Sequence, residues 1–259
     1  MRRQDEGILI ARSVIAFTVA IVLVTEVVAT ITKPNSKGSN CSNIDNPSKE
    51  LLVSAQMGYE TEVKVLLKCK GIDINIAGNV LDLYRTPLMC AAQGGHLEVA
   101  KLLLGHEDIE VNKVISDEEH ATGLGRTALW YASELGNTEL VKQLLTHYQV
   151  DVNVVDVNNR GALYIAVHNG HTEVVGLLIA HPHTNVNKLE DPELFPNYIY
   201  EPKVKFSTAC WIMDCELACM TTIWLASLMG YFDIVKLLLD HPNIMVTKGI
   251  KVDREAMMY

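Results

Sequence analysis

The sequence lacks any concentration of basic residues. Its 259 residues include 22 Lys and Arg against 31 Asp and Glu, and the formal net charge is −9. A nucleic acid as the main partner requires a basic face that neutralises phosphates. Because Lys and Arg form no extended run and the balance is acidic, the composition excludes nucleic-acid binding as the main function.

Cysteine is scarce as well, with six residues in the chain. This number is too small for a protein held together by a disulfide framework. Cys90 lies in an alanine-rich helical stretch, where we expect a free, buried thiol. Cys210, Cys215 and Cys219 are five and four residues apart, which does not match the C-x-x-C pairs of zinc sites, and no fourth ligand is evident. The sequence therefore predicts no metal and no cofactor, with zinc at these three cysteines as the alternative.

Motifs of catalysis are missing too. The sequence contains no H-E-x-x-H motif, nucleophile elbow or phosphate-binding loop. The stretch GLGRTA at residues 123–128 superficially resembles a dinucleotide-binding motif, but it lies in a turn between expected helices and does not follow a parallel strand. We therefore predict that the chain is not an enzyme.

One long apolar segment is present, at residues 8–32, and only Arg12 and Glu26 interrupt it. Its charge-free centre of 13 residues matches the apolar region of a secretory signal, with small residues at 27–29 for cleavage. If both charged side chains extend to opposite interfaces, the 25 residues can instead span a bilayer of roughly 30 Å. Ordinary packing in a soluble protein is the third interpretation.

We predict a hydrophobic leader at residues 1–32 and a single-pass membrane protein. Cleavage of the leader would give a secreted or lumenal protein, and a leader without function would give a cytoplasmic one. Residues 33–46 are rich in Ser, Asn and Gly and are expected to form a flexible linker. Asn40 begins an Asn-Cys-Ser acceptor pattern, so it is a glycosylation site if this region is lumenal.

The rest of the chain repeats one pattern at fixed intervals. AAQGGHLEVAKLLLGH from Ala91 matches ASELGNTELVKQLLTH from Ala132, and further copies begin at residues 54, 166 and 226. Each copy has a glycine at its fifth position, and an asparagine follows seventeen residues later. Such self-similarity indicates a repeat protein. The pairs are Gly58 and Asn75, Gly95 and Asn112, Gly136 and Asn153, Gly170 and Asn187, while Gly230 is followed by Thr247.

The residues of one unit predict two short helices and a strand. Thr86 offers a side-chain cap, and Pro87 suits the first helical position. The glycine ends this helix with a positive φ, and the second helix has apolar residues at i, i+3 and i+4 from Val99. A short extended strand is expected next, as in DIEVN at residues 108–112. Because neither helix can bury its apolar face alone, stacked units share one continuous core.

The pattern resembles the ankyrin repeat family, whose units of about 33 residues contain a T-P-L-H-x-A motif. The best match is TPLMCAAQGGHLEVAKLLL at residues 86–104. The resemblance implies an all-α solenoid of five stacked helix pairs with finger-like β-turn loops over residues 47–247, followed by a tail at 248–259. The histidine of the motif is replaced in this chain by Met89, Trp130, Tyr164 and Trp224.

The units differ most between repeats four and five, where residues 188–220 form an insert in the finger loop. In repeat proteins such insertions collect on one face, which is often the binding face. Aromatic residues of the insert can anchor a partner. Alternatively, they fold back and cover the neighbouring repeat. The candidates are Phe195, Tyr198, Tyr200 and Trp211.

The resemblance also implies a concave face for partner binding. In ankyrin-like proteins, this face includes the residue before the Thr cap and the two residues before the glycine. Arg85, Arg126 and Arg160 are in register and can form a ladder for an acidic partner, or they are simply solvated. The other candidates, at these positions or at the position of the motif histidine, are Gln93, Trp130, Glu134, Tyr164, His168, Trp224, Leu228 and Met229.

Four histidines between residues 162 and 187 raise the question of a metal site. His171 and His181 are separated by about ten helical residues, or roughly 15 Å, which is too far for one ion. His171 follows the turn glycine, His181 marks the end of a second helix, and His183 belongs to the expected strand. Only His168 occupies a variable concave position, so it alone is a candidate for touching a partner.

These features predict a non-enzymatic protein–protein interaction scaffold that is tethered to a membrane through residues 8–32. The alternative is a ligand- or metal-binding regulatory protein centred on the cysteines and aromatic residues of the insert at 188–220.

Overall fold

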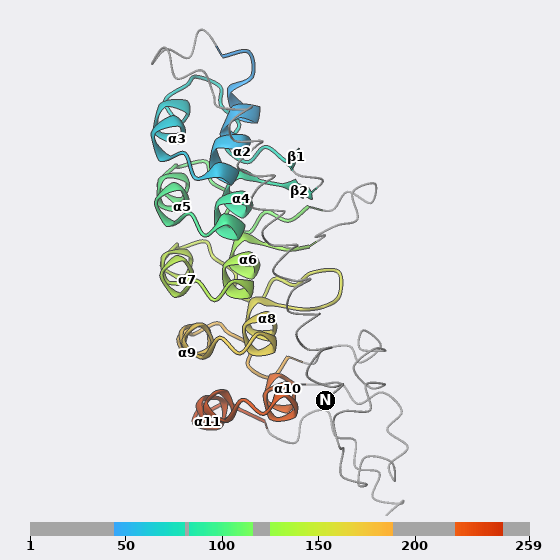
Figure 1. The fold of residues 1–259 in the computed structure, drawn as a ribbon. Coiled ribbons are helices and arrows are strands. Elements are labelled where there is room, and N and C mark those ends of the chain that lie inside the picture. The colour runs from blue at the N-terminus through green and yellow to red at the C-terminus, as the bar shows by residue number, and fades with distance from the viewer. Residues whose placement is uncertain (1–43, 81–82, 116–124, 189–220, 246–259) are drawn as a thin grey trace, which may run out of the picture.

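A computed structural model describes residues 44–80, 83–115, 125–188 and 221–245, and these residues form a column of five helix pairs (Figure 1). The first helices of the pairs form one row, and the second helices form a parallel row beside it. A two-stranded antiparallel hairpin extends from the first-helix row. The pairs are α2 (Pro47–Met57) with α3 (Glu60–Leu66), α4 (Pro87–Gly94) with α5 (Leu97–Leu104), α6 (Ala128–Glu134) with α7 (Thr138–Leu145), α8 (Ala162–His168) with α9 (Thr172–Ala180), and α10 (Thr222–Met229) with α11 (Phe232–Leu239), and the hairpin consists of β1 (Gly78–Val80) and β2 (Leu83–Arg85).

The all-α solenoid predicted from the sequence is confirmed, and so are most of its local signals. The Thr86 side chain accepts a hydrogen bond from the amide of Met89, and Thr127 does the same for Trp130, so both threonines cap a first helix. Thr221 precedes α10 but makes no such side-chain bond. The neighbouring hydroxyl of Thr222 instead donates to the carbonyl of Val186 at 3.1 Å.

The core lies between the two rows and continues from pair to pair. Each first helix places a small, fully buried residue four positions before its turn glycine, which allows neighbouring helices to pack closely. Each second helix contributes a buried leucine, and full burial of one such side chain is worth roughly 1.5–3 kcal/mol. The small residues are Ser54, Ala91, Ala132, Ala166 and Ala226, and the leucines are Leu66, Leu103, Leu144, Leu178 and Leu238.

The turn glycines permit close contact between successive repeats. Gly136 has a φ of 70°, and a Cβ there would lie 2.5 Å from the ring of His171. The Nε2 atom of His171 lies 2.9 Å from the carbonyl oxygen of Glu134. Gly58 and His96 repeat this arrangement two repeat interfaces earlier. His171 therefore has the structural role that the sequence predicted.

The extended strand predicted after each second helix is wrong, because residues 108–112 form turns. The asparagine of the preceding repeat satisfies their backbone instead. The amide of Asn75 donates to the carbonyl of Asp108 at 2.7 Å, and its oxygen accepts from the amide of Glu110 at 2.9 Å. A side-chain amide can do both because it contains a donor and an acceptor. The same pair of hydrogen bonds to the next repeat recurs at Asn112, Asn153 and Asn187. We call these residues, together with Asn75, the asparagine ladder.

Two finger loops show paired backbone in the described part of the chain. In the first, β1 pairs with β2 and Gly78 lies opposite Arg85. In the second, Val155 forms an isolated antiparallel bridge with Gly161. Both loops lead into a first helix, so the side chains near their ends are fixed relative to α4 and α8.

Candidate functional site

The C-terminal ends of the first helices present a row of accessible side chains. Leu135 is 49% exposed, and its neighbours Glu134 and His168 are half-buried. Because α4, α6, α8 and α10 are stacked in series, these positions follow one another along the column (Figure 1). We call this set the helix-end row; it consists of Gln93, Gly94, Glu134, Leu135, His168, Asn169, Leu228 and Met229.

The residues at the position of the motif histidine are mostly core residues. Trp130 and Tyr164 are each only 2% exposed, so they offer little surface to a partner. Trp224 occupies the equivalent place in the last described pair and is 37% exposed. Of these three sequence-predicted candidates, the structure leaves only Trp224 accessible.

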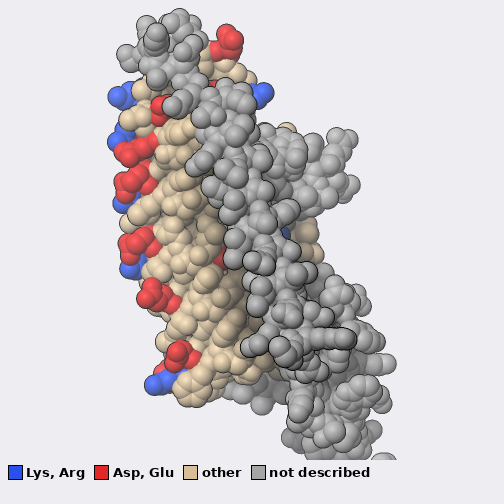
Figure 2. Space-filling view, in the orientation of Figure 1, with Lys and Arg blue, Asp and Glu red and all other residues tan. Residues whose placement is uncertain are grey.

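Charged side chains gather elsewhere, along the edge formed by the second helices. Figure 2 shows acidic and basic groups side by side on this edge. Glu98 bonds Lys101 and Glu139 bonds Lys142, each pair at 2.7 Å and three residues apart. Exposed pairs of this kind contribute little and leave no net charge for a partner.

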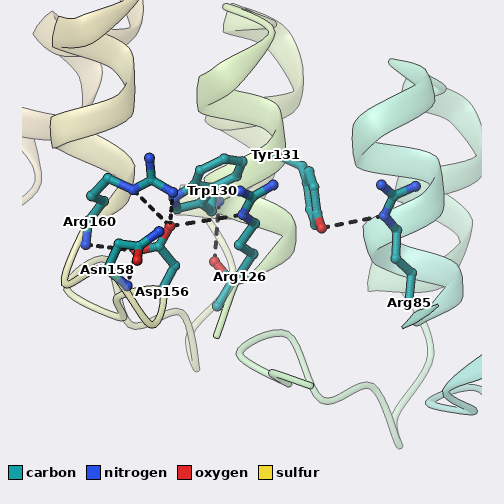
Figure 3. Close-up of polar contacts among 8 residues, drawn as sticks. Arg85, Arg126, Trp130, Tyr131, Asp156, Asn158 and Arg160 are labelled. Carbon is teal, nitrogen blue, oxygen red and sulfur yellow. Dashed lines mark hydrogen bonds and ion pairs between the residues drawn. The ribbon is translucent and has the colours of Figure 1, made fainter. Parts of the chain in front are cut away.

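The three sequence-predicted arginines differ sharply from one another (Figure 3). Arg85 is only 3% exposed. Its Nε donates to the hydroxyl of Tyr131 at 3.4 Å, and its guanidinium carbon lies 5.0 Å from the centre of the Tyr131 ring. This guanidinium is therefore engaged inside the protein and is not a solvated group.

Arg160 is held by Asp156 in the second finger loop. One carboxylate oxygen of Asp156 accepts from Nη2 and Nε of Arg160, at 2.7 and 3.0 Å. The other oxygen accepts from the backbone amides of Asn158 and Arg160, at 3.0 and 2.9 Å. Four hydrogen bonds satisfy a carboxylate, so Asp156 can be buried and can fix the loop.

Arg126 lies between the other two and is positioned mainly by aromatic rings. Its guanidinium carbon is 4.0 Å from the centre of the Trp130 ring and 5.9 Å from that of Tyr131. Its Nε is 3.9 Å from the Asp156 carboxylate, which is an ion pair but too long for a hydrogen bond. The side chain is 27% exposed, and it forms no hydrogen bond within the described part of the chain.

Glu134 faces the same cluster from the end of α6. Burial raises the pKa of its carboxyl, although Arg126, Arg85 and Arg160 lower it. Desolvation therefore outweighs the attraction of three guanidinium groups. Within the described residues none of the three lies close enough to Glu134 to form an ion pair.

Two members of this cluster were missed by sequence reasoning. Asp156 was a detectable candidate, because Asp156, Asn158 and Arg160 have the spacing with which an aspartate bonds the following backbone amides in a turn. Tyr131 was not detectable, because it follows Trp130 in a helix and only the fold turns its hydroxyl toward Arg85.

Several predicted features lie outside the described residues. These are the leader and Asn40, the four aromatic candidates of the insert, and Cys210, Cys215 and Cys219. Among the residues that are described, no group of three His, Cys, Asp or Glu side chains is placed to hold a metal ion. No helix in that part is long and apolar enough to cross a membrane. Cys90 is a free, buried thiol, as predicted.

Comparison with protein families supports the resemblance seen in the sequence. A family model described as ankyrin repeats (3 copies) matches residues 24–115 and 111–190, which together make up more than half of the chain. No curated protein matches the chain significantly. The match leaves the count of five repeats and the leader at 1–32 as predictions.

Proposed function

The chain belongs to the ankyrin repeat family, and on this premise we propose that it is a non-enzymatic scaffold that binds a partner protein through the helix-end row. The repeats themselves support protein–protein interaction as the general function. The observation that favours this surface is Leu135, which is 49% exposed at the end of an otherwise buried helix and lies beside accessible polar residues. Apolar contacts of this kind form the centre of protein interfaces.

The proposed mechanism is rigid presentation. The asparagine ladder and the packing of His171 on Gly136 hold successive repeats at a fixed spacing. Side chains of the helix-end row are therefore ordered before a partner arrives. A surface that is already ordered loses less conformational entropy on binding, so more of the contact energy appears as affinity.

Site-specific photo-crosslinking tests the surface. A photoreactive phenylalanine analogue replaces Leu135 in the full chain, and a matched control carries it at Thr146, which is exposed at the end of α7. We expect one protein to crosslink at position 135 and not at 146, and the purified partner to reproduce the pattern. Equal crosslinking at both positions would contradict the proposal.

The alternative function centres on the insert at 188–220, as a site for a ligand or a metal. Deletion of residues 188–220 distinguishes the two proposals. If the crosslinking partner still binds the shortened chain, the insert is not the binding site. If binding is lost while the helix pairs stay folded by circular dichroism, the insert-centred function replaces the helix-end row.

We further propose that residues 8–32 tether this scaffold to a membrane. The apolar length of the segment supports this, as does the polar linker that follows it. Protease protection of the repeat domain in intact microsomes, together with glycan occupancy at Asn40, measures the topology. A protected domain with a glycan would indicate a lumenal scaffold, and an accessible domain that sediments with membranes would indicate a cytosolic one.

A further inference from the structure

We propose that Arg126 binds an acidic side chain of the partner, so that the scaffold recognises a segment rich in Asp or Glu. We call this binding site the seat. This inference rests on the proposed scaffold function and specifies the chemistry of the partner. Arg126 is singled out because the two neighbouring arginines are already engaged. Arg85 is buried against Tyr131, and Arg160 donates two hydrogen bonds to Asp156.

The guanidinium of Arg126 is fixed in place and partly exposed, and its buried Nε has no hydrogen-bond acceptor in the described part of the chain. Trp130 lies 4.0 Å away under the guanidinium carbon and holds the planar group by a cation–π contact. The nearest carboxylate oxygen, on Asp156, is 3.9 Å from Nε and already accepts two hydrogen bonds from Arg160. A guanidinium pairs best with a carboxylate that accepts two parallel hydrogen bonds. No such acceptor reaches Arg126 in the described part of the chain.

The arginine cluster also has one more positive than negative side chain. Arg85, Arg126 and Arg160 contribute three positive charges, and Asp156 and Glu134 contribute two negative ones when both are ionised. One carboxylate from the partner would balance them. The net charge of −9 on the whole chain opposes an acidic partner only weakly, because salt at 0.15 M screens charges that lie farther away than the Debye length of about 8 Å.

Fluorescence anisotropy with a synthetic peptide tests the seat. The probe is fluorescein-labelled hexaglutamate with an amidated C-terminus, titrated with the full chain at 0.15 M salt. Hexaglutamine with a free C-terminus is the second probe, and it reveals whether a chain terminus binds instead of side chains. We expect hexaglutamate to bind and hexaglutamine not to bind; the reverse result, or no binding of either, would overturn the proposal.

Variants identify the residue responsible. Arg126→Gln should weaken hexaglutamate binding by about fivefold or more, and Arg126→Lys should weaken it also, because it keeps the charge but loses the planar fork. Lys142→Gln is the matched control, since it removes one exposed cation that pairs with Glu139 on the distant edge. Full retention of affinity in Arg126→Lys would mean a general positive field and would overturn the seat.

Glu134→Gln keeps the proposal testable if the Arg126 variants fail to fold. This change removes a competing negative charge and breaks no side-chain contact seen in the described residues, so it should strengthen hexaglutamate binding by about twofold or more. A role of the cluster in stability alone predicts no such gain, and an unchanged affinity would count against the seat. Failure of these peptide experiments would leave crosslinking at position 135 unaffected, so the seat and the scaffold function fail separately.

Discussion

At the scale of single residues, two turn glycines with almost the same backbone allow a matched experiment. Gly136 and Gly230 have φ values of 70° and 74°, but a Cβ on Gly136 would lie 2.5 Å from the ring of His171, whereas no described residue lies within 4 Å of one on Gly230. Gly230→Ala should cost about 1–2 kcal/mol, because a side chain is strained at positive φ. Gly136→Ala should cost about 1–3 kcal/mol more, because His171 must also move.

Urea unfolding of both variants measures this difference in the free energy of unfolding. The additional loss of stability in Gly136→Ala measures how much the contact between His171 and the carbonyl of Glu134 joins the two repeats. Equal destabilisation by the two substitutions would mean that the histidine ring moves without loss, and that it does not hold the repeats together.

Cys90 provides a prediction from its ionisation. Burial raises the pKa of this thiol to about 12, against an ordinary value of 9.0, and outweighs the opposite effect of Arg85. At pH 8 roughly one molecule in ten thousand then holds a thiolate, which is the reactive form. Iodoacetamide should leave Cys90 unmodified in the native protein and alkylate it fully in guanidinium chloride, as mass spectrometry of its peptide will show.

The same shift links stability to alkaline pH. Because the folded pKa is raised, the unfolded chain releases the proton first, and the contribution of Cys90 to stability is lost as pH rises from about 9 to 12. Cys90→Ala should remove this part of the pH dependence. Rapid alkylation of the native protein would contradict both expectations.

Residue roles were the least predictable part of the site. The sequence placed Arg85, Arg126 and Arg160 at equivalent positions, but their contacts differ. Arg126 and Arg160 contact residues only four positions away, Trp130 and Asp156, whereas Arg85 is buried against Tyr131, which is distant in the sequence. The burial of Trp130 could not be predicted either, since an aromatic residue at that helical position can face either the next repeat or the solvent.

At the scale of the elements, the asparagine ladder should control how the last helix pair is attached. Asn187 donates to the carbonyl of Asn243 at 2.6 Å and accepts from the amide of Met245 at 2.7 Å. Asn187→Ala leaves both backbone groups unpaired, and we expect a loss of about 1–3 kcal/mol. The loss should be local, so amide hydrogen exchange should become faster in α10 and α11 and stay unchanged in α4 and α5.

Asn158→Ala is the matched control for this experiment. The side chain of Asn158 lies in a finger loop and makes no hydrogen bond to the described residues, so its removal should change stability by less than about 0.5 kcal/mol. Uniform acceleration of exchange along the column in Asn187→Ala would show that the ladder acts on the whole domain and not on one interface.

The helices were predictable because their signals are local. A threonine cap, a helical spacing of apolar residues and a glycine at positive φ lie within a few residues of one another. The strand after each second helix was predicted wrongly for the opposite reason. Alternating residues such as those at 108–112 suit a strand, but a side chain from the previous repeat, Asn75, binds their backbone. No signal within that segment reveals a partner more than thirty residues away.

At the scale of the whole molecule, a linear stack should unfold unevenly. Among the described helices, the main contacts of each pair are with the adjacent pairs, so stability depends on how many interfaces a pair has. Ile234 of α11 and Leu140 of α7 are both fully buried, but α11 belongs to the last described pair and α7 to a central one. Truncation of either to alanine should cost about 2–5 kcal/mol.

The two truncations should nevertheless differ in their unfolding curves. Ile234→Ala should produce a separate transition at low urea concentration, because only the last helix pair unfolds. The free energy of this transition should depend only weakly on urea. Leu140→Ala should instead shift the main transition to lower urea concentration. Circular dichroism with urea measures both. A single, equally shifted transition in the two variants would mean that the column unfolds as one cooperative unit.

The chemistry of the asparagine ladder has a consequence for where this scaffold can work. Its bonds join uncharged amides to backbone groups, so neither protons nor salt ions compete for them strongly. The contribution of these asparagines to the spacing between repeats should therefore be the same in a neutral cytosol, an acidic lumen or a medium of high ionic strength. The binding surface should therefore keep its geometry, while pH and salt act on its charged side chains. A change of environment would then alter the affinity for a partner without altering the geometry of the surface.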